Sequence, residues 1–270
     1  MPQTLTNVKA VTLEKLWQAQ PVSPGALPQS DTLFDPEDLT AVPPLARRYL
    51  RWAIAPGTPL ASAVRLQMHG TIKLGDQWHC FTGEEVICWQ RGMIWRATAW
   101  MRGLPIFGAD RLVDGVGEAR WKLLGLLPVM QVSGDDVAKS AAGRVQGEAV
   151  WLPSVLCQPS VAWTELNDFQ VRAEFTAFGE PAHLTLTLDA QGAIQQVALQ
   201  RWGNPEGGDY HYDTFGVIAE ASGTFGGYTI PTQIRAGWFL GSDSPPGTLR
   251  DRFEAEGEFF RCTIDQASYR

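Results

Sequence analysis

One stretch of the chain combines charged and aromatic side chains at helical spacing. Arg144 and Glu148 lie four residues apart, and Trp151 follows them closely. Side chains at positions i and i+4 share one face of a helix, so Arg144 and Glu148 can meet. The pair has two interpretations. It is an exposed ion pair that contributes about 0.5 kcal/mol, or it stands at the mouth of a cavity and holds the head group of a ligand.

A second polar and aromatic cluster lies later in the chain. Residues 210–213 read Tyr-His-Tyr-Asp, and Arg201 precedes them. The same two interpretations apply, and we include Arg201 and Tyr212 among the candidate ligand-binding residues. A carboxylate such as Glu148 or Asp213 is also a candidate general base, provided that a partner group comes within hydrogen-bond distance.

Tryptophan is unusually frequent, with 11 residues in a chain of 270. An indole offers a large apolar surface and one N–H donor, and it is rarely buried completely. Indoles therefore often stand on cavity walls, although a single Trp can equally be a core residue. The candidates for a cavity wall are Trp95, Trp100, Trp121, Trp151 and Trp238.

Several kinds of chemistry find no support in the sequence. His69, His79, His183 and His211 lie far from one another, so no short metal-binding spacing is present. Residues 114–118 contain Gly-x-Gly but lack the third glycine of a dinucleotide-binding loop. There is no G-x-S-x-G motif or phosphate-binding loop, and a net charge of −7 disfavours nucleic acid. We expect no metal, no cofactor and no nucleic-acid partner.

The pattern of the chain is dominated by strands. Between Val161 and Arg201, polar and apolar residues alternate on both sides of a short turn, which is typical of an antiparallel meander with one buried face. Pro231 indicates a bulge or an edge in a later strand. Further strands are predicted at residues 63–74, 78–89, 93–101, 210–221, 224–238 and 254–269.

Helices are predicted where the strands are interrupted. Residues 5–20 place apolar side chains on one side, Asp35 and Pro36 are typical of a helix start, and residues 45–54 carry an apolar stripe. A longer helix is expected to begin at Asp135 and to end before Pro153.

Together these elements predict an α+β protein. A curved antiparallel sheet of about nine to eleven strands forms a half-barrel or barrel, with helices and Trp-rich side chains on its concave face. A link rich in Pro and Gly separates an N-terminal helix and linker, residues 1–34, from a single β-rich domain, residues 35–270. Residues 1–28 are therefore expected to be dispensable for folding of the rest.

The remaining expectations concern compartment. The first 20 residues show no secretory signal pattern, and no apolar run is long enough for a transmembrane helix. Cys80 and Cys88 would lie about 26 Å apart in one extended strand, which is beyond disulfide reach. We expect Cys157 and Cys262 to be free as well, and a cytoplasmic protein.

A set of motifs resembles a bacterial family known only as a domain of unknown function. The resemblance covers roughly residues 40–270. Its motifs are Arg144-x-x-x-Glu148-x-x-Trp151-Leu-Pro153-x-x-Leu156, Val161-x-Trp163, Leu186-x-Leu-Asp-x-x-Gly192, Ile230-Pro231-Thr232 and Ala236-Gly-Trp238. The order of strands and helices also resembles the outer-membrane lipoprotein carriers of the LolA and LppX type. That resemblance implies a half-barrel that holds acyl chains against inner helices.

Three functions remain open. The first is a non-catalytic binding protein for a hydrophobic or amphipathic small molecule, since barrel mouths with apolar walls and a few polar groups are common ligand sites. The second is a hydrolase or isomerase that uses a pocket carboxylate, and the third is a protein-interaction module without a pocket. A cavity separates the first two from the third, and a buried carboxylate pair in it favours the enzyme. The oligomeric state is left open.

Overall fold

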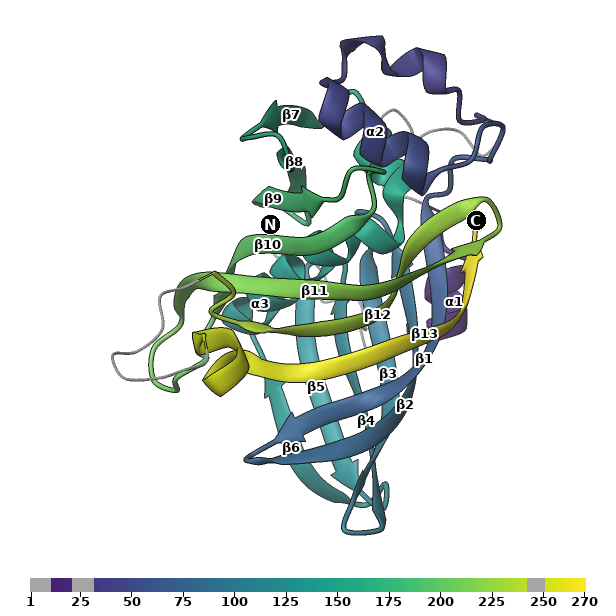
Figure 1. Cartoon of the computed structure of the whole chain (residues 1–270). Coiled ribbons are helices and arrows are strands. Elements are labelled where there is room, and N and C mark those ends of the chain that lie inside the picture. The colour runs from purple at the N-terminus through teal and green to yellow at the C-terminus, as the bar shows by residue number, and fades with distance from the viewer. Residues whose placement is uncertain (1–10, 21–31, 242–250) are drawn as a thin grey trace, which may run out of the picture.

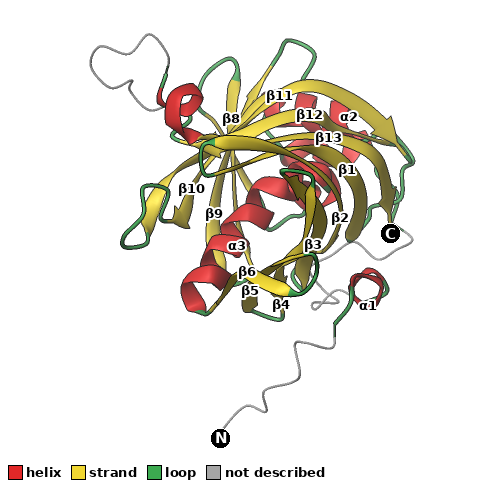
Figure 2. Cartoon of the chain, turned by 90° about the horizontal axis from the view of Figure 1, so that it is seen from below, coloured by secondary structure: helices red, strands yellow, loops and turns green. Residues whose placement is uncertain are grey.

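The protein is a strongly bent antiparallel sheet wrapped around one helix (Figures 1 and 2). The computed structural model describes residues 11–20, 32–241 and 251–270. In this part of the chain one sheet of 13 strands has the order β6-β5-β4-β3-β2-β1-β13-β12-β11-β10-β9-β8-β7. Helix α3 (Asp135–Gly147) connects the two edge strands and lies in the curve of the sheet (Figure 2). The predicted α+β fold with a helix on the concave face is confirmed.

The sheet consists of two meanders that join where β1 pairs with β13. The first meander is β1 (Ala63–Leu74), β2 (Gln77–Cys88), β3 (Gly92–Met101), β4 (Leu104–Val113), β5 (Val116–Leu123) and β6 (Leu127–Ser133). The second is β7 (Ala162–Glu165), β8 (Gln170–Ala177), β9 (Glu180–Leu188), β10 (Ile194–Gly203), β11 (His211–Phe225), β12 (Tyr228–Trp238) and β13 (Glu258–Tyr269).

The 13 strands exceed the predicted nine to eleven because residues 104–133 form three more. These strands lack clean alternation, and β6 is exposed along its whole length because it is an edge strand. Packing requires a glycine at position 108 of β4. The indole of Trp121 lies on it, and a Cβ there would come within 2.0 Å of that ring.

The proline in β12 marks a bulge. Ala221 pairs with Gln233 and Ser222 pairs with Pro231, so one residue of β12 is skipped. Since β12 lies between β11 and β13, it is an interior strand and the alternative of an edge is wrong. The bulge turns the Pro231 carbonyl toward the helical segment that follows α3, where the indole of Trp151 donates to it over 3.0 Å.

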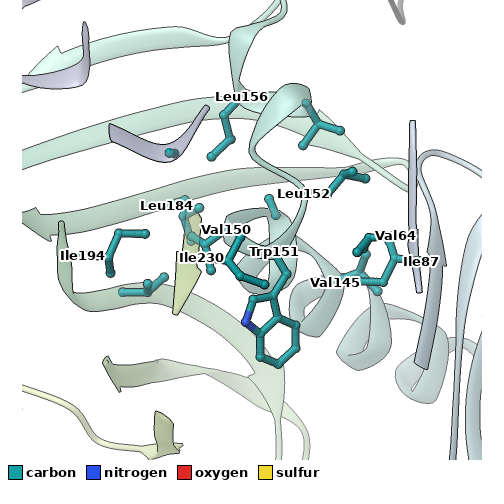
Figure 3. Packing of buried hydrophobic residues seen from close by; sticks show 14 of the residues in the cluster. Val64, Ile87, Val145, Val150, Trp151, Leu152, Leu156, Leu184, Ile194 and Ile230 are labelled. Carbon is teal, nitrogen blue, oxygen red and sulfur yellow. The ribbon is translucent and has the colours of Figure 1, made fainter. Parts of the chain in front are cut away.

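The segment after α3 fills the half-barrel. It continues as the 3₁₀ turns η3 (Glu148–Trp151) and η4 (Pro153–Cys157). Figure 3 shows Val150, Trp151, Leu152 and Leu156 of this segment packed among side chains from both halves of the sheet. Helix α2 (Pro44–Ala53) buries Leu45, Tyr49, Leu50 and Ala53 and packs on η4 and β12, as its predicted apolar stripe requires. Asp35 caps η2 (Pro36–Ala41), and η5 (Phe253–Gly257) precedes β13.

A short helix packs on the outer face of the sheet. Helix α1 (Leu13–Trp17) is shorter than the predicted 5–20, of which residues 5–10 lie outside the described residues. Leu13 and Leu16 are buried with Ala63, Val86 and Ile94. This contact adds an anchor that the sequence did not reveal, and the dispensability of residues 1–28 stays a prediction.

Two further sequence expectations meet the structure here. Cys80, Cys88, Cys157 and Cys262 are all free, as predicted. Across residues 11–20, 32–241 and 251–270, no helix is both long and apolar enough to cross a membrane.

Candidate functional site

A cavity of about 290 Å³ lies between α3 and the concave face of the sheet. Most of its wall is apolar and comes from both meanders and from η3. These apolar residues include Met68, Met93, Val150, Phe215, Ile234 and Phe260. The polar lining residues include Glu85, Asp110, Arg144, Glu148 and Arg201. The cavity therefore offers an apolar surface beside a group of charged side chains.

Strand register explains how residues distant in sequence meet in this wall. Glu85 of β2 is opposite Trp95 of β3, and Trp95 is opposite Asp110 of β4. Side chains of directly opposite residues share one face of a sheet, so all three point toward α3. Arg144 in the last turn of α3 and Glu148 just after it reach down to this row.

The guanidinium of Arg144 binds three carboxyl groups. Its Nε donates to Glu148 Oε1 over 2.6 Å, its Nη2 to Glu85 Oε1 over 2.9 Å and its Nη1 to Asp110 Oδ2 over 3.3 Å. Burial lowers the pKa of Arg144, but Glu148, Glu85 and Asp110 outweigh that effect and leave the pKa above its ordinary value. We call Glu85, Asp110, Arg144 and Glu148 the charged cluster. Within the described residues, no group of three His, Cys, Asp or Glu is placed to hold a metal ion.

Burial favours the protonated form of Glu85. Its side chain is fully buried, and burial raises its pKa well above the ordinary value; Arg144 opposes the shift, and Glu148 and Asp110 add to it. The Oε2 atoms of Glu85 and Glu148 are buried and have no hydrogen-bond partner outside the two carboxyl groups. A hydrogen bond between the Glu85 and Glu148 side chains adds to the shift in the pKa of Glu85, because a carboxyl group must be protonated to donate to a carboxylate.

Arg201 is another arginine in the cavity wall. Its Nε donates to the carbonyl oxygen of Ser140 over 3.1 Å, and its guanidinium lies 4.7 Å from the ring centre of Phe215 and 5.3 Å from that of Trp238. Burial, reinforced by Arg144, lowers the pKa of Arg201 to about 10, so it stays protonated at neutral pH.

The five predicted tryptophans lie at different distances from the cavity. Trp95 and Trp151 line the cavity. Trp121 packs against Trp95 with ring centres 5.4 Å apart and the ring planes tilted by 53°, and it donates from Nε1 to Asp110 Oδ1 over 2.9 Å. Trp238 packs on Phe215 behind the wall. Trp100 is 40% exposed and lies away from the cavity.

The cluster at residues 210–213 splits in the same way. Tyr210 lines the cavity, whereas Tyr212 is 47% exposed and packs on Trp202 outside it. Asp213 accepts from its neighbour Thr214 and does not line the cavity. Of the two carboxylates considered as bases, only Glu148 is therefore placed in the cavity.

Sequence reasoning missed Glu85 and Asp110. The first had a usable signal. The inward positions of β2 are His79, Phe81, Gly83, Glu85 and Ile87, so an acidic residue lies between Phe81 and Ile87 on a largely apolar face. Arg144 and Glu148 also differ from expectation. They are largely buried and bonded to each other and to their neighbours, and neither stands as a free polar group at an opening.

Three solved structures are similar to this chain. A LolA superfamily protein from Nitrosomonas europaea shares 8% identity and a TM-score of 0.42, over 84% of this chain and 92% of that chain. A DUF1329 family protein from Desulfovibrio piger shares 12% identity and a TM-score of 0.35, over 77% and 86%. An outer membrane lipoprotein-sorting protein domain from Vibrio parahaemolyticus shares 9% identity and a TM-score of 0.34, over 87% and 94%.

A comparison with protein families identifies the family of the chain. No curated protein matches the chain. Residues 40–269 match the family described as "Family of unknown function (DUF6920)", in agreement with the resemblance that the motifs indicated. The match spans most of the chain, which therefore belongs to this family.

Proposed function

We propose that the protein binds an amphipathic small molecule in the cavity between α3 and the sheet. The observation that carries this proposal is the cavity of about 290 Å³, with a largely apolar wall and the charged cluster beside it. Sites of this composition are typical of small-molecule binding, because apolar walls supply affinity and a few polar groups fix orientation. No catalytic step is required of the protein in this role.

The arrangement of the charged cluster selects the polar end of the ligand. Nε, Nη1 and Nη2 of Arg144 each donate to a carboxyl group already, so at least three of its five N–H donors are occupied. The cluster contains three carboxyl groups for this one guanidinium, and each carboxylate oxygen can accept more than one hydrogen bond. We therefore assign the ligand a polar end that donates hydrogen bonds, such as an alcohol or an amine.

A titration of tryptophan emission tests this proposal, because Trp95 and Trp151 line the cavity. The probes are decylamine, decanol and decanoic acid, which share a chain and differ in head group. We expect saturable quenching, with decylamine and decanol binding more tightly than decanoic acid. Tightest binding of decanoic acid contradicts the head-group assignment.

A cavity-filling variant supplies the matched control. Ala141 of α3 lines the cavity, so Ala141→Phe places a ring inside it and should abolish quenching by all three probes. Ala190 lies exposed in the turn between β9 and β10, and Ala190→Phe should bind as the wild type does. Equal binding by the two variants contradicts the cavity as the site.

A second candidate function is acid–base catalysis in the same cavity. It is favoured by one observation, the burial of Glu85 in the cavity wall beside Glu148, which raises the pKa of Glu85, because a carboxylic acid that stays neutral can donate a proton to a bound substrate. This candidate predicts that the protein hydrolyses p-nitrophenyl decanoate, and that Glu85→Gln, Glu148→Gln and Ala141→Phe each remove the activity. Binding of decanol without such hydrolysis leaves the binding function alone.

A further inference from the structure

Two neighbouring hairpin turns expose an apolar surface at one end of the sheet. The turns join β3 to β4 and β5 to β6 and lie together at the lower end of the molecule in Figure 1. Leu126 is 79% exposed and Leu127 is 61% exposed. We define the apolar end as the exposed side chains Trp100, Leu104, Phe107, Leu124, Leu126 and Leu127.

Direct contacts make this surface continuous. The backbone N–H of Leu124 donates to the carbonyl oxygen of Pro105 over 2.9 Å, so the two turns are tied together. Phe107 of β4 is opposite Lys122 of β5, next to the second turn. Large contiguous apolar surfaces are uncommon on folded proteins and mark places of interaction.

The charges around the apolar end have one sign. Residues 99–107 and 121–133 contain only two charged residues, Arg102 and Lys122, both exposed and both basic, in a chain of net charge −7. The turn between β7 and β8 differs. It also exposes Leu166 and Phe169, but its neighbouring charges are Glu165 and Asp168. Of these two surfaces, the apolar end is the one that combines apolar insertion with attraction to anions.

We propose that the apolar end docks on a lipid bilayer that contains anionic lipids. Leucine side chains on the turns enter the acyl boundary, Trp100 takes the interfacial position that tryptophan prefers, and the two basic residues meet the phosphates. Edge strand β6 then runs from the bilayer to the ligand cavity, because it begins at Leu127 and carries Val132 in the cavity wall. The docking does not depend on what the cavity binds.

Vesicle flotation tests the docking. The probes are vesicles of phosphatidylcholine alone and of phosphatidylcholine with phosphatidylglycerol. We expect the wild type to float with the mixed vesicles and much less with phosphatidylcholine alone. Leu126→Ser/Leu127→Ser should lower the partition coefficient by about tenfold or more. Arg102→Gln/Lys122→Gln should lower binding to the mixed vesicles only.

The turn between β7 and β8 provides the control variant. Leu166→Ser/Phe169→Ser removes the same kind of side chain from an acidic turn and should leave flotation unchanged. Flotation that is absent with both vesicles, or lost equally in the control variant, overturns the proposal. Sedimentation velocity tests whether a second copy of the chain covers this surface. A wild-type dimer that Leu126→Ser/Leu127→Ser dissociates would assign the surface to that second copy and would also overturn the proposal.

Discussion

The charged cluster and the apolar end place polarity in opposite ways. The cluster puts three carboxyl groups and a guanidinium inside the protein, whereas the apolar end puts leucines and aromatic rings outside it. Inside, Arg144 donates a hydrogen bond to every carboxyl group of the cluster. Outside, Leu126 and Leu127 contribute little to the fold because most of their surface is exposed. The charged cluster is therefore expected to stabilise the fold, and substitutions at the apolar end are expected to leave the stability nearly unchanged.

The largest expected effect comes from removing the centre of the cluster. Arg144→Met leaves Asp110 and Glu148 charged and without their guanidinium, and removing one partner of a buried ion pair costs about 3–5 kcal/mol. Urea denaturation should show a loss of this size in the free energy of unfolding. The control is Arg96→Met, because Arg96 pairs with Glu84 and is 66% exposed, and its loss should be about 0.5 kcal/mol. Equal losses in the two variants would show that the cluster is not structural.

The second effect depends on pH. Because the pKa of Glu85 is raised in the folded protein, mainly by burial, the folded state keeps a proton that the unfolded chain releases above about pH 4.3. The folded state then binds more protons than the unfolded state, so the contribution of Glu85 to stability falls as pH rises through this window.

Glu85→Gln removes that titration. The amide cannot ionise but can still donate to Glu148, so this variant should become more stable relative to the wild type as pH rises. Thermal unfolding across the pH range measures the difference. The exposed Glu37→Gln should run parallel to the wild type. A Glu85→Gln curve that also runs parallel would mean that Glu85 is ionised in the folded protein.

A small effect on stability is expected at the apolar end. Leu126→Ser/Leu127→Ser should change the free energy of unfolding by no more than about 0.5 kcal/mol, as is usual for surface substitutions. Urea denaturation of this variant sharpens the comparison with Arg144→Met. A loss of several kcal/mol would place these leucines in a packed interface.

The cysteines give the smallest effect, a difference in reaction rate alone. Cys80 is exposed, while burial raises the pKa of Cys157 to about 12 and raises the pKa of Cys88 and Cys262 as well. Since the thiolate is the reactive form, one thiol of the native protein should react quickly with a thiol reagent and four should react in denaturant. Cys80→Ser should remove the fast reaction, and its persistence would contradict the assigned burial.

Much of the fold could be predicted from alternation, but not all of it. Strands β8, β9 and β10 have one buried and one wet face, so their pattern is visible in sequence. Strands β4 to β6 were not predicted from the sequence. Strand β6 is exposed throughout, and β4 has a glycine at position 108 because the indole of Trp121 leaves no room for a side chain there. Alternation reports burial, and it fails where an edge strand has no buried face.

The site was predictable only where its contacts are local. Arg144 and Glu148 meet because of helical spacing, which the sequence shows. Glu85 and Asp110 are 59 and 34 residues from Arg144, and they join it through strand register and the path of α3. No short motif records such a meeting, so the sequence suggested an accessible ion pair where the structure has a buried cluster.

Native mass spectrometry of the purified protein, before and after addition of decylamine, tests the central claim that the cavity holds an amphipathic molecule. The account predicts one bound molecule per chain in the wild type and in Ala190→Phe, and none in a folded Ala141→Phe. A wild type that carries no small molecule and takes up no decylamine, or an Ala141→Phe variant that binds as well as the wild type, would contradict it.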